Sequence, residues 1–179
     1  EAWGIDDRRV EPDRATKSIG HEETFARDLS DTSEVHRHLV RMVDAVARRV
    51  RGAGVLGRTV SVKLRYPDFT TVGRSQTLAD PTDLAVEILA AATSLVDSID
   101  ITPGIRLLGV SLSSLQDGSV RQLRFEDVAA PEGRAPGWRD AEGAVDRIRE
   151  RFGTGAIGPA VADDLGPKEV GDSQWGPDV

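Results

Sequence analysis

The stretch that most constrains the fold of this chain is residues 58–78, which read RTVSVKLRYPDFTTVGRSQTL. Its first half alternates apolar and polar side chains, the period of a strand with one buried face. The apolar positions are Val60, Val62, Leu64 and Tyr66, and the polar positions between them are Ser61, Lys63 and Arg65. Pro67 and Asp68 favour a turn, and residues 69–78 are rich enough in Thr and Val to predict a returning strand. The sequence therefore predicts a β-hairpin with an apolar face and a basic face.

Charge is distributed unevenly along the 179 residues. The formal net charge of the whole chain is −7 at pH 7. Residues 58–78 nevertheless hold four basic residues and one acid, giving +3, whereas residues 80–101 hold five acids and no base. Because the local field governs anion binding more than the net charge does, the basic hairpin face is a candidate surface for an anionic partner.

Two further segments predict strands. Residues 17–25 predict a short strand whose Ile19 and Phe25 share one face and point toward the core. Gly20 carries no side chain, so either another molecule approaches the backbone closely there, or the glycine is only a weak position in an edge strand. Residues 105–115 predict the last strand, with Leu108, Val110 and Leu112 on one face.

Two segments predict amphipathic helices. Residues 31–51 carry apolar side chains at helical spacing, with Asp31 as the expected N-cap. Residues 81–96 predict a second helix, capped by Asp80 and with Pro81 in its first turn.

The order of these elements predicts an α+β, βαββαβ ferredoxin-like fold. A four-stranded sheet would carry both helices on one face and leave the other face open. Alternation puts Ser61, Lys63 and Arg65 on the open face. Arg74 shares its parity with Val72, so strict alternation directs it toward the core, whereas a bulge at Gly73 would turn it outward.

The domain boundaries follow the composition. Residues 1–16 predict a linker, 17–115 the globular domain and 116–138 a second linker rich in Gly, Pro and charge. We expect a short amphipathic helical element at 139–160, with Ala141, Val145, Ile148 and Phe152 on one side, and a disordered tail at 161–179. The chain begins at Glu1, and we expect it to be a fragment.

Several classes of chemistry find no support in the sequence. The chain has no cysteine, which excludes disulfides, thiolate metal sites and a cysteine nucleophile. It has no apolar run long enough for a membrane span. His36 and His38 point to different faces of their helix, so we expect surface histidines rather than a metal pair. We expect no catalytic residue and no metal ligand.

Three motifs in order resemble the C-terminal little-finger domain of Y-family DNA polymerases, polymerase IV branch. They are KSIGHEETF at 17–25, the hairpin at 58–78 and IRLLGVSLSSL at 105–115, with a helix in each interval. The segment GIDDRRVEPDRATKSIG resembles the family's linker between thumb and little finger. The tail AEGAVDRIRERFGTGAIGPA is similar to the C-terminal end of some actinobacterial members. The resemblance covers residues 3–160.

The resemblance implies a domain that lies across duplex DNA and contacts phosphates with its open sheet face, mostly without reading bases. The residues that match the family's DNA-binding motifs are Lys17, Ser18, Ile19, Gly20, Lys63, Arg65, Arg74 and Ser75. Lys and Arg side chains neutralise phosphate charge, and backbone N–H groups at 18–20 can donate to phosphate oxygens. The resemblance also favours an outward Arg74, and hence a bulge at Gly73.

The resemblance implies that the whole protein is an error-prone translesion DNA polymerase, a cytoplasmic and monomeric enzyme that uses Mg²⁺. In that family the metal-binding acids lie on the palm, upstream of this chain. We therefore expect residues 1–179 to lack nucleotidyltransferase activity and to bind no cofactor of their own.

A short peptide at 121–126 matches the place where polymerase IV relatives bind the sliding clamp. Gln122, Leu123 and Phe125 would be its anchors. The common bacterial form has Leu and then Phe at the fourth and fifth positions, whereas here Phe125 is fourth and Glu126 follows. The alternative is that Leu123 and Phe125 hold the linker against the edge of the domain.

Two other functions fit a fold of this type. One is a ferredoxin-like RNA-binding module, which would stack bases on strand aromatics; the hairpin offers only Tyr66 and Phe69, both near the turn. The other is a ligand-sensing regulatory or enzymatic domain, for which no clustered catalytic side chains are present.

Overall fold

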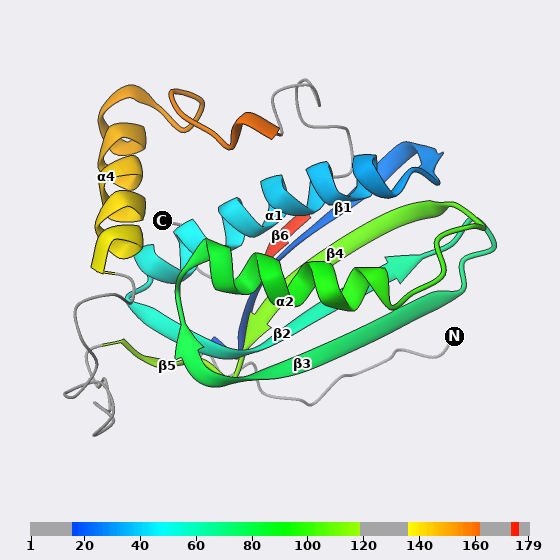
Figure 1. The fold of residues 1–179 in the computed structure, drawn as a ribbon, viewed down its shortest axis with the longest axis horizontal. Coiled ribbons are helices and arrows are strands. Elements are labelled where there is room, and N and C mark those ends of the chain that lie inside the picture. The colour runs from blue at the N-terminus through cyan, green and yellow to red at the C-terminus, as the bar shows by residue number, and fades with distance from the viewer. Residues whose placement is uncertain (1–15, 119–135, 162–172, 176–179) are drawn as a thin grey trace, which may run out of the picture.

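The computed structural model describes residues 16–118, 136–161 and 173–175. The elements, labelled as in Figure 1, are β1 (Ser18–Leu29), α1 (Thr32–Gly52), β2 (Val55–Arg65), β3 (Thr71–Thr82), α2 (Ala85–Asp97), β4 (Ile105–Ser113), β5 (Gln116–Asp117), α4 (Pro136–Phe152) and β6 (Ser173–Trp175). The predicted order of strand, helix, strand, strand, helix, strand is confirmed over residues 18–113.

The sheet has the strand order β3-β2-β4-β1-β6, and every pairing in it is antiparallel. It follows that β1 runs parallel to β2 with β4 between them, and that β3 runs parallel to β4 with β2 between them. Each helix thus links two parallel strands that a third strand separates, and the two split βαβ units interleave. β5 pairs separately with the beginning of β2.

β6 adds a strand that the sequence did not predict. Residues 20–22 of β1 pair with residues 173–175, which belong to the tail that we expected to be disordered. That expectation is wrong for these three residues, since a strand partner at the free edge of β1 orders them. The remaining residues of the tail after 161 lie outside the described part of the chain.

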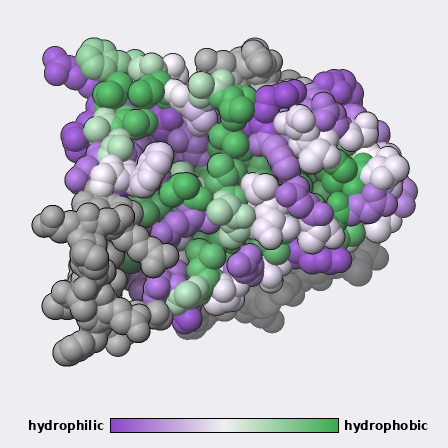
Figure 2. Space-filling model, in the orientation of Figure 1, coloured by the Kyte–Doolittle hydropathy of each residue, from purple (hydrophilic) through white to green (hydrophobic). Residues whose placement is uncertain are grey.

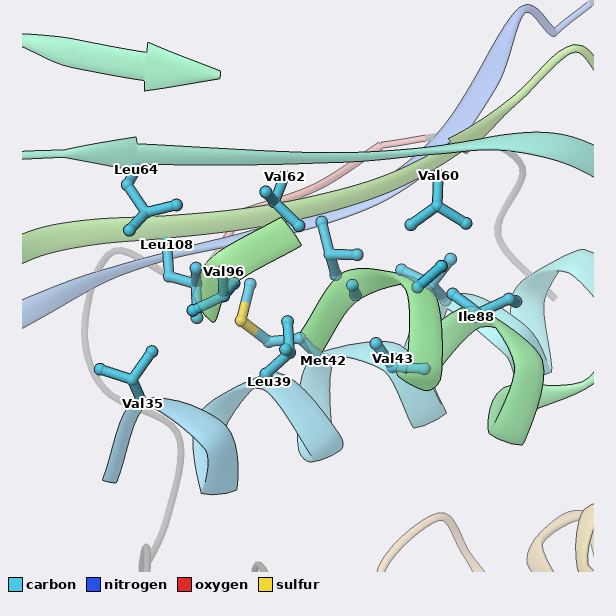
Figure 3. Close-up of a cluster of buried hydrophobic side chains, with 14 of the residues drawn as sticks. Val35, Leu39, Met42, Val43, Val60, Val62, Leu64, Ile88, Val96 and Leu108 are labelled. Atoms are coloured by element: carbon cyan, nitrogen blue, oxygen red, sulfur yellow. The ribbon is translucent and has the colours of Figure 1, made fainter. Parts of the chain in front are cut away.

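The core lies between the sheet and the two helices that cover one of its faces (Figure 1). Val60, Val62 and Leu64 of β2 point from the sheet toward Leu39 and Met42 of α1 (Figure 3). Ile88 and Val96 of α2 and Leu108 of β4 belong to the same buried layer. The alternation in β2 and the helical spacing in α1 and α2 therefore meet in one core, as predicted, and burial of these side chains is the main stabilising contribution.

The two helices begin in different ways. Asp31 caps α1 as predicted, because its carboxylate accepts the N–H of Ser33 at 2.9 Å. The predicted cap of the second helix is wrong: Asp80 and Pro81 belong to β3, and α2 begins only at Ala85. Strand pairing explains the difference, because Gly57 pairs with Thr82 and so keeps the chain extended to that residue.

A buried polar cluster lies under β1. The Glu23 carboxylate is fully buried, forms an ion pair with Arg41 and contacts His38, whose Nδ1 lies 3.4 Å from Oε1. The His38 ring also packs against Phe25, with 4.6 Å between ring centroids. His38 is thus buried, contrary to the expected surface position, because a carboxylate on the facing strand gives it a partner.

α4 docks on the other helices through a polar face. Arg51 of α1 donates to Asp146 at 2.6 Å and to Glu142, and Arg149 of α4 pairs with Asp44 of α1 at 2.9 Å. The expected helical element is therefore present, but its apolar side is turned away from the core. Apolar side chains gather over α4 on the visible surface (Figure 2). Ile148 and Phe152 of α4 are both exposed.

None of the described helices is long and apolar enough to cross a membrane.

Candidate nucleic-acid interface

The strand register defines the open face of the sheet, the face opposite α1 and α2. Directly paired residues of antiparallel strands lie on the same face, so the pairings assemble rows of side chains across β1, β4, β2 and β3. The rows are Ser18, Ser113, Thr59 and Thr77; Gly20, Ser111, Ser61 and Ser75; Glu22, Gly109, Lys63 and Gly73; and Thr24, Leu107, Arg65 and Thr71. This face is rich in hydroxyl groups and carries both charged signs.

Two of the predicted cations, Lys63 and Arg65, lie on the open face. The Arg65 guanidinium donates through Nε to the Thr71 hydroxyl at 3.1 Å, which orients it along the surface. Lys63 forms an ion pair with Glu22 across β4. Lys17 is exposed immediately before β1. Lys63 and Arg65 can therefore meet a polyanion from the open side.

Arg74 lies on the other face, and the predicted bulge at Gly73 is wrong. The register from Thr71 to Thr77 is continuous, and Arg74 is paired with Val62, whose side chain is in the core. The irregularity in this hairpin falls between Gly57 and Thr59 instead. Because β3 is an edge strand, Arg74 is exposed even on the helix side, and its Nη1 donates to the carbonyl of Gly73 at 3.0 Å.

The backbone of residues 18–20, which was predicted to contact phosphate, is less accessible than the sequence indicated. The Ile19 side chain is fully buried in the core. Gly20 lies between β4 and β6, and its carbonyl accepts a hydrogen bond from Arg49 at 2.9 Å. Ser18 lies beyond the residues that pair with β6, so the start of β1 remains at the edge of the described sheet.

Sequence reasoning missed most of the hydroxyl rows. Thr59 contacts the hydroxyls of Thr77 at 3.3 Å and Ser114 at 3.1 Å. On β4, Ser113 is paired with Thr59 and Ser111 with Ser61. The signal was present, since Ser111 and Ser113 alternate with the apolar Val110 and Leu112. Hydroxyl groups donate to phosphate oxygens without adding charge.

Neither a metal site nor the clamp peptide can be built from the described residues. Within 16–118, 136–161 and 173–175, no three His, Asp or Glu side chains converge in a way that could hold a metal ion. These described residues therefore offer no donor set that fits Mg²⁺. Gln122, Leu123 and Phe125 lie outside the described part of the chain.

The fold and the open face define the class of this protein, an α+β domain that presents a hydroxyl-rich, partly basic sheet surface. The model of the impB/mucB/samB family C-terminal domain matches residues 16–125, more than half of the chain. The chain therefore belongs to this family, the little-finger domain of Y-family DNA polymerases.

Curated relatives carry the name DNA polymerase IV. That of Desulfatibacillum aliphaticivorans is 41% identical over 163 residues, which cover 89% of this chain and 40% of the relative. That of Streptomyces coelicolor is 40% identical over 135 residues, which cover 75% of this chain and 28% of the relative. The chain thus spans less than half the length of either relative, and the family match assigns it to their C-terminal domain.

A solved Y-family DNA polymerase chimera has the same fold over 57% of this chain and 29% of its own, with 15% identity and a TM-score of 0.51.

Proposed function

We propose that the open sheet face binds duplex DNA through its phosphates, with little preference for base sequence. The observation that carries the proposal is the strand register, which aligns Lys63 and Arg65 with rows of Ser and Thr hydroxyls on a face that no described helix covers. Cations and hydroxyl donors complement phosphate oxygens, and such contacts position a protein on DNA without specifying sequence.

The chemistry of the face favours a duplex backbone over single-stranded RNA. Modules that bind single strands stack bases on aromatic side chains. The strands β1 to β4 present no aromatic side chain on the open face. Tyr66 donates its hydroxyl to the carbonyl of Asp100 at 2.7 Å, and Phe69 lies beside the guanidinium of Arg106 at the turn.

The binding experiment measures fluorescence anisotropy of three labelled probes of equal length: two duplexes of unrelated sequence and one single-stranded RNA. We expect dissociation constants of about 1–100 µM for both duplexes, within about threefold of each other, and a linear fall of log K with log salt. Tighter binding of the RNA, or strong discrimination between the two duplexes, would contradict the proposal.

The proposed parent enzyme is a cytoplasmic, monomeric translesion DNA polymerase whose Mg²⁺ site lies outside this chain. The support is the name DNA polymerase IV of relatives that are 40–41% identical. Its little finger would hold template-primer duplex while the missing palm performs nucleotidyl transfer. Residues 1–179 alone should not extend a primer in the presence of Mg²⁺, and templated incorporation by this chain would contradict the assignment.

We further propose that the peptide 121–126 binds the sliding clamp. The family match continues to residue 125 and so includes Gln122, Leu123 and Phe125. Gln122 offers an amide donor and acceptor, and the other two offer apolar anchors for a pocket.

A double substitution distinguishes clamp binding by this peptide from packing of the peptide on the domain. Gln122→Ala with Phe125→Ala should abolish binding to a bacterial clamp in surface plasmon resonance and leave the melting temperature unchanged. If clamp binding persists while the melting temperature falls, the peptide holds the linker on the domain and does not bind the clamp.

A further inference from the structure

The centre of the open face carries an acid as well as a base. Glu22 of β1 and Lys63 of β2 lie in the same row, separated by Gly109 of β4. A Cβ atom at Gly109 would lie 3.4 Å from Oε2 of Glu22 and 3.6 Å from its Cγ. The Glu22 side chain therefore extends over the backbone of Gly109 and forms its ion pair with Lys63 on the far side.

This ion pair changes the charge that the face presents. Of the described open-face rows, Lys63 and Arg65 supply the positive charges and Glu22 the negative one. The side chains of Glu22 and Lys63 are 20% and 41% exposed, so an approaching phosphate meets both of them. It must compete with the Glu22 carboxylate for Lys63 and is also repelled by that carboxylate.

We propose that the Glu22 carboxylate competes with phosphate for Lys63. By holding Lys63 in an ion pair, Glu22 limits how strongly the open face binds nucleic acid. The inference rests on the proposed DNA-binding function and adds a regulating residue to it. Gly109 is part of the arrangement, since its missing side chain leaves the surface over which Glu22 reaches. Weak, non-specific phosphate contacts of this kind allow a protein to move along duplex DNA.

The test uses Glu22→Gln in the full chain of 179 residues, with duplex binding measured at about 50 and 200 mM salt. Removing the charge frees Lys63 to contact a phosphate, so the salt slope should steepen by about 0.9. The gain in affinity should then be about threefold larger at the lower salt concentration, the factor that such a slope gives for a fourfold change in salt.

The matched control is Glu87→Gln, which removes the same charge from an exposed position on α2, on the helix side of the sheet. It should leave both affinity and salt slope near those of the unmodified chain. The double variant Glu22→Gln with Lys63→Gln should not show the steeper salt slope of Glu22→Gln, because it has no Lys63 ammonium to contact a phosphate.

Three outcomes are decisive. Tighter binding with a steeper slope that depends on Lys63 supports the inference. Binding by Glu22→Gln that equals Glu87→Gln, or a steeper slope that persists without Lys63, overturns it. If neither the unmodified chain nor Glu22→Gln binds duplex at low salt, the proposed DNA-binding function fails, and this inference fails with it.

Discussion

Arg65 and Arg74 belong to the same hairpin, yet they lie on opposite faces of the sheet. Arg65 pairs with Thr71 on the open face, whereas Arg74 pairs with the core residue Val62. The parity of the sequence predicted this position for Arg74, and the family resemblance favoured the other one. A continuous register excludes the bulge that an outward Arg74 would need.

Single substitutions of these two arginines test the assignment of faces. Arg65→Ala should weaken duplex binding and lower the salt slope by about 0.9, because one phosphate contact is lost. Arg74→Ala removes the same charge from the same hairpin and should leave the slope unchanged. A lower slope for Arg74→Ala would show that the helix-side edge of β3 also contacts DNA.

Glu23 gives the domain a defined dependence on pH. Burial alone would raise the pKa of Glu23, but hydrogen bonds from His38 and Arg41 outweigh it and hold the pKa below its ordinary value of 4.5. Because the folded-state pKa is depressed, the unfolded state takes up the proton first as the pH falls. The stabilisation is therefore present above pH 4.5 and is lost as the pH falls through the lower folded-state value.

Glu23→Gln should remove this dependence. At neutral pH the free energy of unfolding of the variant should be about 2 kcal/mol lower, because Arg41 loses its buried partner. Between neutral pH and acid, urea unfolding should show a shallower loss of stability for Glu23→Gln than for the unmodified chain. Glu87→Gln on the exposed surface of α2 serves as control, and parallel curves for all three proteins would contradict the role of Glu23.

At the scale of elements, α4 supplies the N-terminus of α2 with an acceptor that the local sequence lacks. Leu84, at the N-cap position, offers no capping side chain. The Glu142 carboxylate of α4 instead accepts the N–H of Ala85, with oxygens at 3.0 and 3.3 Å. Burial raises the pKa of Glu142, although the Ala85 N–H and the Arg51 guanidinium lower it. The ionised form is thus partly disfavoured, while the acceptor role remains.

Glu142→Ala should lower the free energy of unfolding by about 1–2 kcal/mol, the cost of a lost helix cap and a weakened ion pair. Glu142→Gln should lose less than half as much, because its amide oxygen still accepts from Ala85 and the buried charge is gone. Glu150→Ala, an exposed position on the same helix, should have almost no effect. Chemical denaturation of the three variants measures this order, and equal losses for Glu142→Ala and Glu150→Ala would contradict the cap.

Elements built from local pattern were predictable, and those fixed by distant partners were not. The alternation in 58–66 and the helical spacing in 31–51 were enough to predict β2 and α1. The start of α2 was not predictable, because strand pairing extended β3 over Asp80 and Pro81. The docking of α4 depends on contacts such as Arg51 with Asp146, which lie far apart in sequence. The sequence pattern within a single element cannot predict a contact between residues so far apart.

At the scale of the whole molecule, two helices bury one face of the sheet and leave its other face polar. The sequence predicted this division and the cations on β2. It did not predict the hydroxyl rows or the opposing Glu22, because both follow from the register that brings β1 and β4 beside β2. We propose that this open face, and not the helix side, binds duplex DNA.

The most direct measurement is the salt dependence of duplex binding for Lys63→Ala and Arg65→Ala combined. The control combines Arg147→Ala and Arg151→Ala, which removes two cations from α4 on the helix side. We predict that the open-face variant lowers the salt slope by about 1, because Glu22 already engages Lys63, and that the control leaves it unchanged. An unchanged slope for the open-face variant, or an equal fall for both, would contradict the account.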